Sequence, residues 1–92
     1  MDLLFKALAD PTRRSILDQL SKHDGQTLFE LCQRLLFEHK VESSRQAISQ
    51  HLDVLEAADL IRIKRQGRYK FHFINTEPLK AIQQRWNHEE SS

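Results

Sequence analysis

The sequence has only one cysteine, Cys32, among 92 residues. No disulfide can therefore form within the chain, and a disulfide-stabilised scaffold is excluded. Two glycines and two prolines are too few for a low-complexity chain. No apolar run approaches the roughly 20 residues of a membrane span, and residues 1–10 show no signal-peptide pattern. These absences favour a reduced, cytoplasmic protein with no membrane partner.

A strong net charge is also missing, since 14 basic and 13 acidic residues leave a formal charge of +1. The charges are nevertheless distributed unevenly. Residues 43–70 contain six basic and three acidic side chains, whereas the rest of the chain is net negative. Residues 62–70 contain five basic side chains and no acidic one. Such an asymmetry in a small protein indicates a face that meets phosphate.

Length and composition, with 39% hydrophobic and 29% charged residues, predict one folded domain over residues 1–92. A chain of this size buries only about 60–65% of its unfolded surface, so its own core is modest. Additional apolar faces near the termini would be well used in a dimer. Residues 88–92 are expected to be a frayed tail.

Apolar residues at helical spacing predict three short helices in the first part of the chain. The first covers residues 2–9, and the second begins with Asp10 as its N-cap and Pro11 in its first turn. The third begins at Thr27, because Thr27 and Glu30 have the spacing of a capping box.

A fourth helix is predicted from Ser43 to about Ala58, where Ser43 and Gln46 are spaced as a second capping box. The stretch before it, residues 37–42, is expected to be a long polar loop, so the docking angle of this helix is left open. Its buried stripe would be Ile48, Leu52 and Leu55. Its opposite face would carry Gln46, Ser49, Gln50 and Asp53, with Arg45 on the flank.

The apolar period changes from 3.6 to 2 after residue 60. Ile61 and Ile63 alternate with basic residues, and Tyr69, Phe71 and Phe73 alternate with Lys70 and His72. Between them, residues 65–68 form a turn in which Gly67 supplies the unusual backbone conformation. The pattern predicts an antiparallel hairpin with the isoleucines and aromatic residues on one face and the basic and polar residues on the other.

A last helix is predicted after Thr76, with Leu79, Ile82 and Trp86 as its apolar stripe. The fold class is then mainly α with a β-hairpin, about five helices plus two antiparallel strands. Two successive helices followed by a basic hairpin describe a winged helix-turn-helix. A helix of 10–12 Å diameter fits a major groove about 12 Å wide, and the hairpin can lie against the phosphates.

Three phrases of the sequence resemble a known family. They are FKALADPTRRSILDQL (residues 5–20), RQAISQHLDVLEAADLI (45–61) and RQGRYKFHF (65–73). Together they are similar to the opening, the reading helix and the wing of the ArsR-type winged-helix repressors, and they cover nearly the whole chain. The resemblance implies a homodimer built from the first and last helices, which represses transcription by binding an inverted-repeat operator in double-stranded DNA.

The resemblance and the residue pattern together give the expected site residues. The reading-helix residues are Ser44, Arg45, Gln46, Ser49, Gln50 and His51. The wing residues are Arg62, Lys64, Arg65, Gly67, Arg68, Tyr69 and Lys70. The dimer residues are Leu3, Leu4, Leu8, Leu79, Ile82 and Trp86.

Many members of that family sense metals through a pair of cysteines in the third helix. Here Cys32 is present, but Arg34 stands where the second cysteine would be, and one thiolate is too few for such a site. His88 with Glu89 and Glu90 could contribute to a metal site between subunits, but residues 79–87 offer no histidine or acid to complete it. We expect no metal site and no cofactor, and a small-molecule effector is left open.

Nothing in the sequence resembles a nucleophile with its base, a phosphate-binding loop or a pair of catalytic carboxylates, so an enzyme is not expected. Two alternatives to a plain DNA-binding repressor remain. A winged helix can serve as a protein-interaction module, because fold alone does not fix function. A metal- or thiol-responsive form of the repressor, acting through Cys32, is the other.

Overall fold

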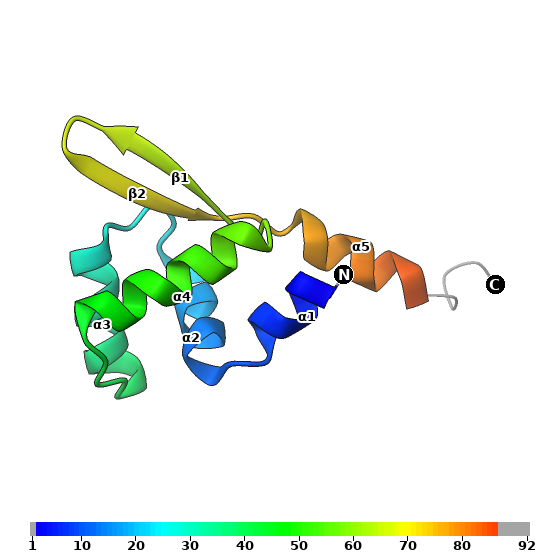
Figure 1. Ribbon diagram of the computed structural model, residues 1–92, viewed down its shortest axis with the longest axis horizontal. Coiled ribbons are helices and arrows are strands. Elements are labelled where there is room, and N and C mark those ends of the chain that lie inside the picture. The colour runs from blue at the N-terminus through cyan, green and yellow to red at the C-terminus, as the bar shows by residue number, and fades with distance from the viewer. Residues whose placement is uncertain (1, 87–92) are drawn as a thin grey trace.

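The computed structural model describes residues 2–86, which form five helices and one two-stranded antiparallel sheet (Figure 1). In chain order the elements are α1 (Asp2–Leu8), α2 (Pro11–Lys22), α3 (Leu28–His39), α4 (Arg45–Ala57), β1 (Ile61–Gln66), β2 (Tyr69–Ile74) and α5 (Glu77–Trp86). The predicted fold class is confirmed. The predicted frayed tail (88–92) and the histidine and acids at 88–90 lie outside the described residues.

Two predicted helix starts are confirmed by their capping bonds. The Asp10 carboxylate accepts a hydrogen bond of 3.0 Å from the backbone N–H of Arg13, and Pro11 occupies the first turn of α2. At α3, the Thr27 hydroxyl accepts from the backbone N–H of Glu30, and the Glu30 carboxylate accepts from that of Thr27. Each such cap stabilises its helix by about 1 kcal/mol.

The start of α4 differs from the prediction, because its N-cap is Ser44 and not Ser43. The Ser44 hydroxyl accepts a hydrogen bond of 3.1 Å from the backbone N–H of Ala47. Gln46 therefore lies one position too early for a capping box. Two adjacent serines offer the same capping chemistry, so the sequence alone did not distinguish them.

The predicted polar loop over 37–42 is also wrong in extent. Helix α3 continues to His39 and ends at Lys40, which adopts a left-handed conformation with φ of 57°. The Gln19 side-chain amide of α2 is hydrogen-bonded to Glu38 and His39, which fixes this last turn against α2. The segment that joins α3 to α4 is thus only residues 40–44.

Helices α2, α3 and α4 pack against one another around the core, α1 packs on α2 and α4, and the hairpin contacts α4 through β1 and α2 through β2 (Figure 1). The buried apolar residues are Leu4, Ala7, Ile16, Leu17, Leu20, Leu31, Leu35, Ile48, Leu52, Leu55, Ala58, Leu60 and Ile61. Full burial of each Leu or Ile contributes about 1.5–3 kcal/mol. The predicted stripe of α4 is confirmed, and it holds the opposite face of that helix outward.

The register of the hairpin corrects the prediction for its two faces. Ile61 pairs with Ile74 and Ile63 pairs with His72, and paired residues lie on the same face of a sheet. The isoleucines therefore share their face with His72, which is 4% exposed. Phe71 and Phe73 lie on the other face, opposite Lys64 and Arg62.

A short turn and a contact with the α2–α3 connection explain this register. The strands run to Gln66 and from Tyr69, so the turn is only Gly67 and Arg68, with Gly67 at φ of 63°. His72 makes two backbone hydrogen bonds with Gln26, of 2.8 and 3.1 Å, and its ring Nδ1 lies 2.8 Å from the Gln26 carbonyl oxygen. These bonds fix His72 on the inner face.

Helix α5 has no fully buried residue and leaves the core along the side of α1 (Figure 1). Leu79 and Ile82 pack against the core, and the Trp86 ring lies 6.4 Å from that of Phe5. The backbone carbonyl of Thr76 accepts the first helical hydrogen bond, from Lys80. In residues 2–86 no helix has the length and apolar character needed to cross a membrane.

Candidate nucleic-acid interface

The outward face of α4 presents the predicted polar side chains. Arg45, Gln46 and Gln50 are exposed, and Ser49 is half-buried between them and the core. Ser44 is exposed as the N-cap of the helix. Arginine, glutamine and serine are the residue types that hydrogen-bond to base edges in the major groove. The free backbone N–H groups at the start of α4 add partial positive charge at the same end.

His51 does not lie with these side chains, although it was predicted to. Its ring is half-buried and points toward the start of α2, where Arg13 Nη1 donates a hydrogen bond of 3.1 Å to its Nδ1. The Asp10 carboxylate lies 3.9 Å from the same nitrogen. Although desolvation acts to raise the pKa of Asp10, the backbone hydrogen bond from Arg13 and the positive charge of Arg13 hold it below its usual value. His51 therefore connects α4 to α2.

The wing, residues 61–74, is basic on both of its faces. All five of its basic side chains are exposed, namely Arg62, Lys64, Arg65, Arg68 and Lys70. Arg65 and Lys70 are paired on the inner face, whereas Arg62 and Lys64 lie on the face of the phenylalanines. Tyr69 is 60% exposed beside the turn. A ribbon with cations on both sides can approach phosphates from either side.

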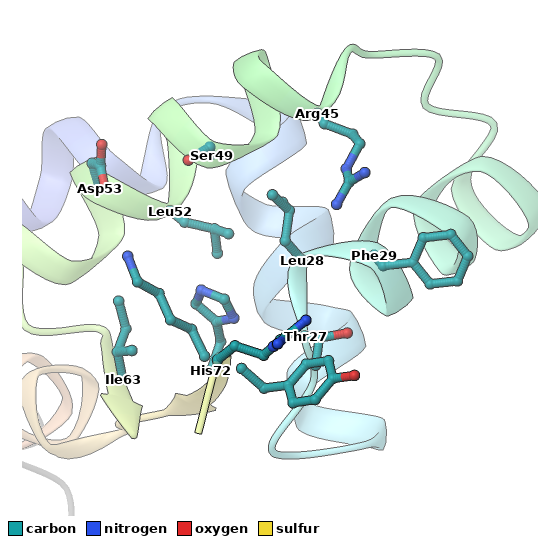
Figure 2. A pocket seen from close by; sticks show the side chains of 12 residues that line it. Thr27, Leu28, Phe29, Arg45, Ser49, Leu52, Asp53, Ile63 and His72 are labelled. Atoms are coloured by element: carbon teal, nitrogen blue, oxygen red, sulfur yellow. The ribbon is translucent and has the colours of Figure 1, made fainter. Parts of the chain in front are cut away.

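The wing and α4 enclose a groove of about 540 Å³, drawn in Figure 2. It brings together Arg45 and Ser49 of α4 with Arg68, Tyr69 and Lys70 of the wing, all of them predicted site residues. The remaining lining residues are Thr27, Leu28, Phe29, Leu52, Asp53, Ile63 and His72. We call this site the wing groove. Gln46 and Gln50 do not line it, because they lie on the outer side of the helix.

Sequence reasoning missed the contribution of α3 to this site. Thr27, Leu28 and Phe29, at the start of α3, line the wing groove, and Phe29 is 55% exposed. The only signal for them in the sequence was the capping box that fixes the start of α3. His72 was also missed, because the alternation of the strand had placed it on the outer face.

A second groove, of about 580 Å³, lies between α3 and the segment before α4. Cys32 lines it together with Phe29, Leu36 and Val41. Burial raises the pKa of the Cys32 thiol, and the nearby Arg45 charge offsets this only in part. Among residues 2–86 there is no group of three or more metal-ligating side chains.

The predicted dimer residues are divided between the core and the surface. Leu4 is buried inside the chain, and Leu8, Leu79 and Ile82 are partly buried against the core. Leu3 and Trp86 are 61% and 56% exposed. Phe5, which the sequence reasoning did not include, is exposed beside Trp86. Helices α1 and α5 thus share an apolar surface that extends beyond the core.

Comparisons with known proteins place this fold in a family. The family model of a helix-turn-helix domain matches residues 8–64. The chain is 48% identical over 85 residues to YuzN, an uncharacterized HTH-type transcriptional regulator of Bacillus subtilis, with 92% of each chain covered. It is 35% identical over 80 residues to the transcriptional repressor SdpR of the same organism, covering 87% of this chain and 81% of SdpR.

Solved structures share the whole architecture. An ArsR-like transcriptional regulator from Rhodococcus sp. RHA1 superposes with a TM-score of 0.81 at 29% identity, covering 98% of this chain and 76% of that one. The helices α3 and α4 with the adjoining hairpin define a winged helix-turn-helix protein. With the sequence relatives, this shows that the chain belongs to the ArsR-type family of winged helix-turn-helix transcriptional regulators.

Proposed function

We propose that this protein is a homodimeric transcriptional repressor that binds an inverted-repeat operator in double-stranded DNA. The observation that carries the proposal is the shared surface of α4 and the wing. Arg45 of α4 lines a groove with the wing, which carries five exposed cations and no acid, and Gln46 and Gln50 are exposed on the outer side of the same helix. In this arrangement α4 reads base edges and the wing neutralises phosphates, which separates specificity from affinity.

The proposed dimer contact is formed by α1 and α5 of the two subunits. The exposed side chains of Leu3, Phe5 and Trp86 lie there, next to the partly buried Leu79 and Ile82. A chain of 92 residues has a modest core, so covering this surface would add stability. Twofold symmetry then places the two copies of α4 about 34–36 Å apart, one turn of B-DNA. We propose that the protein acts in the cytoplasm, by occupancy of the operator and without catalysis.

Selection of bound duplexes from a random pool tests the proposal directly. We expect the selected sites to be inverted repeats whose half-sites are centred about 10–10.5 base pairs apart. Sedimentation or mass measurement of the free protein should give twice the mass of the 10.9 kDa chain. Selected sites without symmetry, or no enrichment at all, would contradict the proposal.

The α3 surface favours a second candidate function, a protein-interaction module. Phe29, Leu36 and Phe37 are all exposed on α3, at 55%, 45% and 72%. Titration with a random duplex at low salt distinguishes the two functions, because binding to phosphates weakens steeply as salt is added. A module for protein partners alone would show no salt-dependent association with the duplex.

A further inference from the structure

The base of the wing groove is apolar. A surface that only bound phosphate groups would not need an apolar base. Leu52 is buried at its base, and the half-buried Leu28 and Ile63 lie beside it. The exposed rings of Phe29 and Tyr69 also line the groove. Its volume of about 540 Å³ lies within the range of roughly 300–1,000 Å³ that is typical of small-molecule sites. An apolar, planar body would bury its surface here.

The charged side chains that line the groove favour an anion. Arg45, Arg68 and Lys70 carry three positive charges, and Asp53 is the only carboxylate among the lining residues. All four side chains are exposed, so they lie at the open side of the groove and remain hydrated when it is empty. A carboxylate on the ligand would therefore be placed at this open side, with the apolar body below it.

His72 adds a polar group at the buried side. It is 4% exposed, lines the groove, and its ring points from β2 toward Leu52 of α4 (Figure 2). The carbonyl oxygen of Gln26 only accepts hydrogen bonds, so the 2.8 Å contact selects the tautomer of His72 with its proton on Nδ1. Nε2 is then an acceptor, and within residues 2–86 no side chain or backbone group donates to it.

We propose that the wing groove binds a small aromatic carboxylate that carries a hydroxyl or N–H donor. The donor bonds to Nε2 of His72, the ring lies on Leu28, Leu52 and Ile63, and the carboxylate faces the three cations. The groove contains side chains of both α4 and the wing, so a bound acid excludes a phosphate backbone from it. That last consequence rests on the proposed DNA-binding function, whereas the binding itself does not.

The probe for the test is 6-hydroxy-2-naphthoate, titrated into the ¹⁵N-labelled protein and followed by amide chemical shifts. We expect the shifts to concentrate at residues 27–29, 49–53, 63 and 69–72. The matched probe 2-naphthoate, which lacks the hydroxyl, should bind about fivefold more weakly, as expected for one lost hydrogen bond. Shifts centred on α1 and α5 or around Cys32, or equal affinity for the two probes, would overturn the proposal.

Two variants test the individual contacts. His72→Phe should bind the two probes with equal affinity, because the acceptor is gone. Lys70→Gln should weaken both probes by about two- to threefold, the effect of one exposed charge. The matched control Lys80→Gln, in α5 and outside the groove, should leave both affinities unchanged. If His72→Phe does not fold, the comparison of the two probes on the unmodified protein decides the proposal.

Competition with DNA separates this proposal from the proposed function. Saturating 6-hydroxy-2-naphthoate should release a fluorescent duplex bound at low salt. If the duplex binds but the groove amides do not shift with the probe, only the ligand proposal fails. If the groove amides shift but the protein has no affinity for any duplex, the ligand proposal holds and the proposed function fails.

Discussion

Replacement of Gly25 by alanine is expected to destabilise the protein far more than the same replacement at Gly67. Both glycines have positive φ, 75° and 63°. A Cβ atom on Gly25 would lie 2.8 Å from Cε1 and 3.0 Å from Cζ of Phe73. A Cβ atom on Gly67 would have no atom within 4 Å. The two positions therefore share a backbone effect and differ in a steric one.

The magnitudes follow from these two effects. A left-handed conformation costs a residue with a side chain roughly 1–2 kcal/mol, which is the whole expected effect at Gly67. At Gly25 the ring of Phe73 must also move, and overpacking of this kind costs about 1–3 kcal/mol more. We expect Gly25→Ala to lower the free energy of unfolding by about 2–5 kcal/mol, at unchanged dependence on denaturant.

Urea unfolding at one fixed protein concentration measures both variants, because the stability of the proposed dimer would depend on concentration. The double variant Gly25→Ala/Phe73→Leu isolates the steric part, since the smaller side chain should recover much of the added loss. Equal losses for Gly25→Ala and Gly67→Ala would refute the reasoning. So would a double variant that recovers nothing.

Three further predictions concern the site, the thiol and a helix cap. Arg68→Gln should weaken binding to all duplexes and reduce the slope of log affinity against log salt by about 1, which a salt titration measures. Gln50→Ala should instead change the sequence preference by about 1–3 kcal/mol at one base pair, which selection of bound duplexes measures. The pKa of Cys32 is raised by burial, so its alkylation by iodoacetamide at pH 7 should be slower than that of free cysteine, and an equal rate would contradict this. Asp10→Ala should cost about 1 kcal/mol at neutral pH. Because the folded pKa of Asp10 is lowered, this contribution is present above the ordinary pKa of about 3.9 and is lost as the pH falls through the lower folded pKa. The urea midpoints of variant and parent should therefore converge in acid, below the ordinary pKa.

The sequence predicted those parts of the fold that depend on local chemistry. The N-cap of α2, the capping box of α3 and the buried stripe of α4 each depend on residues within one or two turns, and all three are confirmed. The end of α3 depends instead on Gln19 of α2, which holds Glu38 and His39. A contact between residues about twenty positions apart leaves no local pattern.

The wing and His51 also depend on contacts that are distant in sequence, which local patterns do not predict. Alternation in β2 correctly gave a strand, but which face is buried depends on the partner strand and on Gln26 of the α2–α3 connection. The helical period places His51 at the boundary between the buried and the exposed face of α4, so it does not predict where the ring points. The hydrogen bond with Arg13 directs the ring toward α2. Within the candidate site, the exposed cations were predictable from composition, whereas the apolar base and His72 required the packing of three elements.

The Arg13 side chain has a wider consequence. Its guanidinium donates to the carbonyl oxygens of Lys6 and Ala7 at the end of α1 and to His51 in α4. One rigid, planar group thus joins the helix proposed to meet the second subunit to the helix proposed to enter the major groove. In the proposed dimer, a rotation of one subunit against the other would act on α4 through the contacts of Arg13. Subunit geometry and the alignment of the two recognition helices on a duplex would then change together.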